Sequence, residues 1–262
     1  MQEVKTKKRR LRFTLRTLLI LSIVASVGLA WLSTKMRQAK IEHEVVERHC
    51  AKGYMFCNVY FDYQSGMAND KTGTPPAPAF LRSMSADNLF SPINSIITGS
   101  KEAVEIFDEP IDLGQLEFIS IRYAGELDRL EFLSRCPKLK TLQVFDSRLK
   151  SIDELSAVQK LDHLTLNGTE VTSIEPISQL KELKTVSLKF RTTRLDSIEP
   201  LLGLPKLKVL HFDYNGNEAD MEVLCQLKKL ETLKLSPYTF SPVETEHLKT
   251  ALPNVKIKYN GF

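Results

Sequence analysis

Residues 161–182, LDHLTLNGTEVTSIEPISQLKE, form one copy of a unit that recurs over most of the chain. Six segments open alike, with starts separated by 23, 22, 22, 24 and 23 residues: LEFISI at 116, LKTLQV at 139, LDHLTL at 161, LKTVSL at 183, LKVLHF at 207 and LETLKL at 230. Each opening places apolar residues at positions 1, 4 and 6. One such unit cannot bury its apolar face alone, so several must stack around a continuous core.

The second half of the unit repeats as well, with SIDE at 151, SIEP at 173 and SIEP at 197. A weaker opening precedes the six, with Ile93, Ile96 and Thr98 at the matching positions, and a final one, VKIKY, begins at Val255. This pattern and length are those of a leucine-rich repeat. We therefore predict an α/β solenoid over residues 86–262, a horseshoe whose parallel β-sheet lines the concave face.

The unit at 161–182 resembles the short leucine-rich repeats of bacterial proteins of the internalin type. It departs from them at position 9, where an asparagine normally ladders beneath the backbone. Successive units carry Ala124, Ser147, Thr169, Arg191, Asn215 and Tyr238 there. The whole layout is similar to bacterial single-pass envelope proteins, which implies a membrane-bound protein from a family that generally lacks a defined activity.

The last repeats have a more helical pattern. Ser241-Pro242-Val243-Glu244 is a capping box with proline at the first helical position, which predicts a helix ending at about Ala251. Cys136 and Cys225 fall on the helical side of their repeats and are most simply core thiols.

Side chains at positions 2, 3, 5, 7 and 8 are expected on the concave sheet, the usual binding surface of such solenoids. Aromatic and arginine side chains, which are enriched at protein interfaces, occur there among charged residues. The candidate ligand-binding residues are Phe118, Arg122, Tyr123, Phe145, His163, Lys189, Phe190, His211 and Tyr214. The alternative for any single aromatic residue is that it covers a strand edge or packs under a loop.

The charge distribution argues against a nucleic-acid partner. The net charge of the 262-residue chain is +4, but residues 1–40 hold ten Lys and Arg and one acidic residue, a balance of +9. The remaining 26 basic and 31 acidic residues leave the body at −5. A basic surface that tracks phosphates is therefore not expected on the folded part.

The N-terminus has the composition of a membrane anchor. Seven positive charges in residues 1–16 precede an uncharged run of 18 residues, 17–34, and three positive charges follow it. As a helix the run spans about 27 Å, close to the thickness of the bilayer core. This asymmetry predicts a cytoplasmic tail, 1–16, and an exported body. The alternatives are a signal peptide cleaved after Ala30 and a buried soluble helix.

Residues 35–85 are expected to link the anchor to the repeats through a helix, an aromatic strand at 54–63 and a Pro-rich linker at 64–78. On the strand, Met55, Cys57, Val59, Phe61 and Tyr63 would form the buried face. An exported body permits a disulfide between Cys50 and Cys57, but we favour two thiols, with Cys57 in a core.

Motifs of catalysis are missing from the sequence. It contains no Gly-rich phosphate loop, Gly-x-Ser-x-Gly elbow, His-Glu-x-x-His pair or Cys-x-x-Cys pair. We predict no catalytic residue, metal or cofactor, and a membrane-tethered module that binds a protein, or an envelope polymer, on its concave face. The alternatives are a structural envelope protein that self-associates through a sheet edge or the aromatic strand, and an enzyme with a distributed site.

Overall fold

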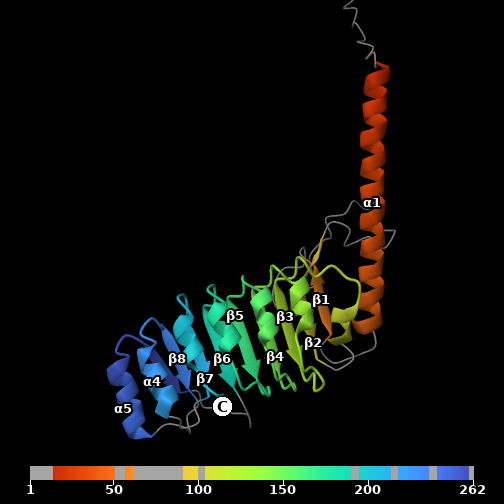
Figure 1. The fold of residues 1–262 in the computed structure, drawn as a ribbon. Helices are drawn as coiled ribbons and strands as arrows, with labels where there is room; N and C mark the ends of the chain where they lie inside the picture. The colour runs from red at the N-terminus through yellow and green to blue at the C-terminus, as the bar shows by residue number, and fades with distance from the viewer. Residues whose placement is uncertain are drawn as a thin grey trace, which may run out of the picture.

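The computed structural model describes residues 14–50, 57–61, 91–99, 104–189, 195–213, 218–235 and 241–259. They build one nine-stranded sheet in which the strands follow the order of the chain (Figure 1). The strands are β1 Asn58–Phe61, β2 Ile93–Thr98, β3 Phe118–Arg122, β4 Thr141–Phe145, β5 His163–Asn167, β6 Thr185–Lys189, β7 Val209–Phe212, β8 Thr232–Leu235 and β9 Lys256–Tyr259. β1 is antiparallel to β2, and every later pair is parallel.

The repeat determines the register of this sheet. Position 4 of each unit lies opposite position 4 of the next, as in Leu142, Leu164 and Val186. These side chains and those at position 6 are fully buried in the six main units, from Ile119 to Leu235. Because side chains alternate across a strand, the residues between them face the concave side. The α/β leucine-rich repeat solenoid is therefore confirmed.

Both incomplete units belong to the sheet. Ile96 lies opposite Ile119 and Thr98 opposite Ile121, as the weak first copy predicts. The last copy is offset from its predicted start, because Ile257 lies opposite Leu233 and so occupies position 4. Val255 therefore stands at position 2. The sequence pattern misplaces this unit because only Ile257 provides a strongly apolar anchor in the strand.

Short helices cover the convex side. The first five are single 3-10 turns: η1 Glu105–Asp108, η2 Glu131–Arg135, η3 Asp153–Ala157, η4 Glu175–Gln179 and η5 Glu199–Gly203. The recurring serine explains three of them, since the hydroxyls of Ser151, Ser173 and Ser197 accept hydrogen bonds from the backbone N–H two residues on. This local bond competes with continued extended structure and starts the turn.

True α-helices, α4 Glu218–Gln226 and α5 Pro242–Ala251, replace the 3-10 turns at the C-terminal end. The predicted capping box at the start of α5 is present. The backbone N–H of Glu244 donates to the Ser241 hydroxyl at 3.2 Å, and the Ser241 N–H donates to the Glu244 carboxylate at 2.7 Å. Two free N–H groups of the first turn are thereby satisfied.

A single helix, α1 Leu15–Cys50, joins the apolar run to the solenoid (Figure 1). Its first half is long and apolar enough to cross a membrane, with a mean hydropathy of 2.0 and no buried residue in that window. Its second half buries Ala39, Glu42, Val45 and His49, which share one helical face, against the first repeat. Among the described residues it is the one helix with such an apolar window.

Polar contacts hold the end of α1 against the loop after η1. The Glu109 carboxylate accepts a hydrogen bond from Arg48 at 2.8 Å and lies 3.1 Å from the ring nitrogen of His49. The hydrogen bond with His49, together with the nearby Arg48 charge, lowers the pKa of Glu109 although partial burial opposes this. These contacts between Glu109 and the end of α1 therefore favour the ionised carboxylate.

A disulfide joins Cys50 at the end of α1 to Cys57 at the start of β1. The two Cα atoms are 5.0 Å apart, within the usual range for a bridge. The structure thus differs from the two free thiols that we favoured from the sequence. The reason is that α1 and β1 are adjacent in space, which the spacing of the cysteines does not reveal.

The described part of the aromatic strand, β1, is buried on both sides. Cys57 and Val59 are buried, as the alternation predicts, but Tyr60 on the opposite side is only 4% exposed. Tyr60 lies opposite Ser95 of β2. Met55, Tyr63, the linker at 64–78 and residues 1–13 of the basic tail lie outside the described residues.

The register can be tested at two neighbouring residues of β5. Leu166 is fully buried, whereas Thr165 faces the concave side and is half-buried. We expect Leu166→Ala to lower the free energy of unfolding by about 2–5 kcal/mol, because it leaves a cavity in the shared core. Thr165→Ala should change it by about 0.5 kcal/mol or less. Urea unfolding of both variants measures the contrast, and a larger loss for Thr165→Ala would refute the register.

Candidate protein-interaction surface

The concave side carries three columns of side chains, one residue per strand in each column. They correspond to positions 3, 5 and 7 of the repeat unit. Phe118 and His163 belong to the first column, His211 to the second, and Arg122, Phe145 and Lys189 to the third. The first and third columns are four residues apart along a strand, which is about 13 Å. Apart from His211, these predicted residues therefore divide between the two ends of the strands.

An aromatic cluster forms where β3 and β4 end. The Arg122 guanidinium carbon lies 4.8 Å from the centre of the Phe145 ring, within the range of a cation–π interaction. The next residue, Tyr123, is 60% exposed. The Arg122–Tyr123–Phe145 group, here called the aromatic cluster, is the part of the predicted set that the structure brings together.

The backbone at Tyr123 is left-handed, with a φ of 56°. The same turn recurs one and two units later, at Asp146 with a φ of 49° and at Gly168 with a φ of 66°. In each case the N–H donates to a carbonyl at the end of the next strand, as from Tyr123 to Phe145 at 3.0 Å. The turn therefore belongs to the repeat, and Tyr123 occupies a conformation that costs an L-residue about 1 kcal/mol or more.

Charged residues occupy the other end of the strands. Asp162 lies 2.6 Å from the ring nitrogen of His163 and 3.4 Å from the Lys184 ammonium. Partial burial raises the pKa of Asp162, but the hydrogen bonds and charges of His163 and Lys184 outweigh it and leave the pKa below its ordinary value. His163 thus belongs to an ion-pair network at the amino end of β5, well away from the aromatic cluster.

His211, near the middle of β7, is neutral at physiological pH. Burial, together with the positive charges of Lys234 and Lys189, lowers its pKa from 6.5 to about 4. Its Nε2 atom is buried and has no hydrogen-bond partner among the described residues. His163 and His211 lie on strands separated by β6 and do not form a pair.

The fifth position is less exposed than the pattern predicts. Ser120 and Ser187 lie at this position on the concave side but are only 2% and 8% exposed. Phe190 and Tyr214, predicted at position 8, lie outside the described residues.

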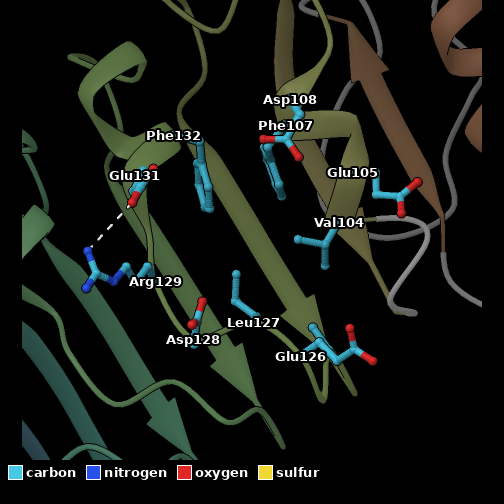
Figure 2. A pocket seen from close by; sticks show the side chains of 11 residues that line it. Val104, Glu105, Phe107, Asp108, Glu126, Leu127, Asp128, Arg129, Glu131 and Phe132 are labelled. Atoms are coloured by element: carbon cyan, nitrogen blue, oxygen red, sulfur yellow. Dashed lines mark ion pairs between the residues drawn. The ribbon is translucent and has the colours of Figure 1, made fainter.

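A groove at the first repeats was not predicted from the sequence (Figure 2). It has a volume of about 340 Å³ and lies between η1 and the segment from Ala124 to η2. Phe107 and Phe132 stack in it, with ring centres 4.1 Å apart. Its acidic residues are Glu105, Asp108, Glu126, Asp128 and Glu131, of which Glu131 lies 3.8 Å from Arg129. The groove is therefore negatively charged, a property spread over two repeats and not visible in either one.

The described residues contain no group of three or more His, Cys, Asp or Glu side chains arranged to hold a metal. Of the two predicted core thiols, Cys136 is fully buried, and burial raises its pKa to about 12. Cys225 is half-buried, and burial raises its pKa as well. Such thiols remain protonated at neutral pH and are poor nucleophiles.

Comparison with known proteins agrees with the fold. The chain is 29% identical over 131 residues to acidic leucine-rich nuclear phosphoprotein 32 family member A of Drosophila pseudoobscura pseudoobscura, and the match covers 47% of the chain and 48% of that protein. The chain thus spans about half the length of the curated relative that it matches. No family model matches it.

Similar solved structures include an internalin of Listeria monocytogenes, with a TM-score of 0.47, 22% identity, and coverage of 57% of this chain and 43% of that one. A leucine-rich repeat protein of Leptospira interrogans has a TM-score of 0.43, 23% identity and coverage of 61% and 46%. Internalin C2 of Listeria monocytogenes has a TM-score of 0.44, 17% identity and coverage of 66% and 83%.

The repeated unit, the parallel sheet in register and the convex turns define the class: the chain is a leucine-rich repeat protein. Solenoids of this class typically present an extended concave surface to other macromolecules. The fold is therefore of a kind that suits a protein-interaction module.

The lowered pKa of His211 predicts a pH-dependent stability. The folded protein binds this proton only near pH 4, whereas the unfolded chain binds it near pH 6.5, so the contribution is complete above pH 6.5 and is lost as the pH falls toward 4. Between pH 6.5 and pH 4, we expect the free energy of unfolding of His211→Gln to fall less than that of the wild type, by on the order of 1–3 kcal/mol. Urea unfolding of both proteins at several pH values measures it. Parallel pH profiles would show that His211 titrates normally.

Proposed function

We propose that the chain is a non-catalytic, membrane-tethered recognition module that binds a protein partner on its concave face, at a site centred on the aromatic cluster. The observation that carries the proposal is the exposed Tyr123 side chain on a left-handed backbone, beside the Arg122–Phe145 pair. Strained, exposed aromatic residues occur at functional sites, where the surrounding structure holds them in place.

The chemistry of the cluster favours a protein partner. Tyrosine and arginine are the side chains that most often dominate binding energy at interfaces, because they bury a large area and lose little rotational freedom. The cation–π contact holds the Arg122 guanidinium over Phe145 before any partner arrives. Such preorganisation lowers the entropic cost of binding.

The membrane tether is supported by the continuity of α1. The helix runs unbroken for 36 residues, through the apolar segment and on to the docked half, which closes the first repeat. We propose that residues 1–16 are a cytoplasmic tail, that 17–34 cross the bilayer, and that 35–85 link the span to the solenoid outside the cytoplasm. The positive charges at the N-terminal side support this orientation. A signal sequence would share the apolar composition.

The structural alternative, self-association through a sheet edge or the aromatic strand, has less support. Tyr60 is buried within the chain, so the described part of the aromatic strand offers little free surface. At the other end of the sheet, β9 carries the exposed Lys256 and Lys258. Lysines on an edge strand oppose pairing with a second sheet.

The binding proposal predicts a separation of stability from binding at Tyr123. We expect Tyr123→Gly to change the free energy of unfolding by less than about 1 kcal/mol, because relief of the left-handed strain offsets the greater freedom of glycine in the unfolded chain. The same variant should lose most partner capture. Crosslinking and capture of the full-length protein from native membranes, compared between variants, measures this. The control is Leu202→Ser, which removes a side chain that is 42% exposed on the convex side. Equal capture by the wild type and Tyr123→Gly would contradict the proposed site.

The tether predicts a defined topology. A reporter enzyme that folds only outside the cytoplasm should be active when fused after Phe262, and the protein should stay in the membrane fraction after a carbonate wash. A cytoplasmic fusion partner at the same position serves as the control. A soluble product beginning at Trp31 would show instead that the apolar segment is a cleaved signal.

A further inference from the structure

The turns that lead into the strands carry a regular series of lysines. Each turn occupies five residues: 113–117, 136–140, 158–162, 180–184, 204–208 and 227–231. Together they hold four acidic residues and nine lysines, a net charge of +5, although residues 41–262 as a whole are acidic. The lysines are Lys138, Lys140, Lys160, Lys181, Lys184, Lys206, Lys208, Lys228 and Lys229, and all nine are exposed. We call this surface the lysine edge.

Ion pairs neutralise only part of the lysine edge. Four of its lysines pair with the four acidic residues, for example Lys140 with Glu117 at 2.8 Å and Lys208 with Glu231 at 2.6 Å. The other five have no carboxylate partner among the described residues. Of these, Lys138 donates to the Gln115 amide, and Lys181 donates to the carbonyls of Ser178 and Gly203. Lys160, Lys228 and Lys229 are solvent-exposed charges.

The lysine edge faces the same way as the apolar half of α1. Near the end of α1, Arg48 and His49 contact Glu109. Nearer the apolar half, Gln38 donates to the Pro110 carbonyl at 3.4 Å, and from there the chain continues into the turn before β3. In Figure 1 the apolar half of α1 extends beyond the array on the side where β3 and β4 begin.

The distances allow an electrostatic contact with the bilayer. Gln38 follows the last residue of the apolar run by four positions, which is about 6 Å along a helix. The Debye length at physiological ionic strength is about 8 Å. Gln38, which contacts the segment leading to the first turn of the edge, therefore lies within one Debye length of the end of the apolar run. Membrane helices are commonly tilted by about 20° from the bilayer normal. A tilt of α1 toward the array would bring the more distant repeats closer to the membrane surface.

We infer that the lysine edge binds the anionic lipid headgroups of the membrane that holds α1, so that the solenoid lies along the bilayer surface with its aromatic cluster turned away from it. This inference rests on the proposed membrane tether. It explains the placement of the charges: lysines repeat at the edge that faces the membrane, whereas the acidic groove of Figure 2 lies beside the turn that follows β3. Basic clusters next to a membrane span bind anionic lipids in this way.

The test uses the full-length protein in vesicles of phosphatidylcholine, with and without phosphatidylglycerol, and measures the acylation rate of each lysine by mass spectrometry. In the anionic vesicles we expect Lys138, Lys160, Lys228 and Lys229 to react about fivefold more slowly than in the neutral ones. Lys150 and Lys258, which lie outside the lysine edge, should react equally in both. High salt should remove the difference. Equal rates for the edge lysines in both kinds of vesicle would overturn the inference.

Two matched variants distinguish an effect of the lysine edge from an effect of the net charge of the protein. Replacing Lys138, Lys160, Lys228 and Lys229 by Gln should abolish the protection that remains at Lys140 and Lys208 in anionic vesicles. Replacing Arg148, Lys150, Lys234 and Lys258 by Gln changes the net charge equally and should leave the protection intact. Equal loss in both variants would show a general charge effect and overturn the inference.

Flotation of the same samples distinguishes a failure of the tether from a failure of the lysine edge. The tether predicts that the protein floats with neutral vesicles and resists carbonate. If it does not, both the tether and this inference are wrong. If it floats but its edge lysines react at equal rates, the lysine edge alone is wrong and the proposed function stands.

Discussion

The apolar contacts between neighbouring units at positions 4 and 6 are the interaction on which the rest of the structure depends. Each side chain, such as Leu164, is covered by the equivalent residues of the units before and after it, here Leu142 and Val186. The contact keeps adjacent strands in register at about 4.8 Å, and everything else is attached to that spacing. It also leaves the ends of the stack uncovered, so a solenoid requires terminal caps. The antiparallel β1 and the docked half of α1 close the first repeat, and α5 packs against the last ones.

Much of this architecture is predictable from the sequence, because the core residues repeat with a fixed period. The capping box at Ser241 and the serine-initiated 3-10 turns are predictable for a different reason, because each depends on residues close together in the chain. The start predicted for the last unit is wrong by one residue, because its strand has a single strong apolar anchor, Ile257. The disulfide between Cys50 and Cys57 was not favoured, since its formation depends on how a helix and a strand meet.

The candidate site was predictable as a surface but not as a cluster. The columns of the concave face follow from the alternation of strand residues, yet nothing in the pattern distinguishes Arg122 and Phe145, which touch, from His163, which pairs with Asp162 at the opposite end. The left-handed backbone of Tyr123 is likewise invisible, because a tyrosine rarely adopts this conformation, unlike the glycine and aspartate at the equivalent positions. Surfaces that combine residues from neighbouring units, such as the acidic groove, need the three-dimensional stack to be recognised.

The unbroken helix α1 has a mechanical consequence. No flexible hinge separates its apolar half from the half that is locked to the solenoid by buried side chains, by Glu109 and by the disulfide. In a tethered protein the anchor and the array would therefore move as one rigid arm, so that a rotation of the helix in the bilayer sweeps the whole array around its axis. The height of the concave face above the membrane would then depend on the tilt of α1 alone. A partner would then be selected by how far from the bilayer it presents its epitope as well as by its chemistry.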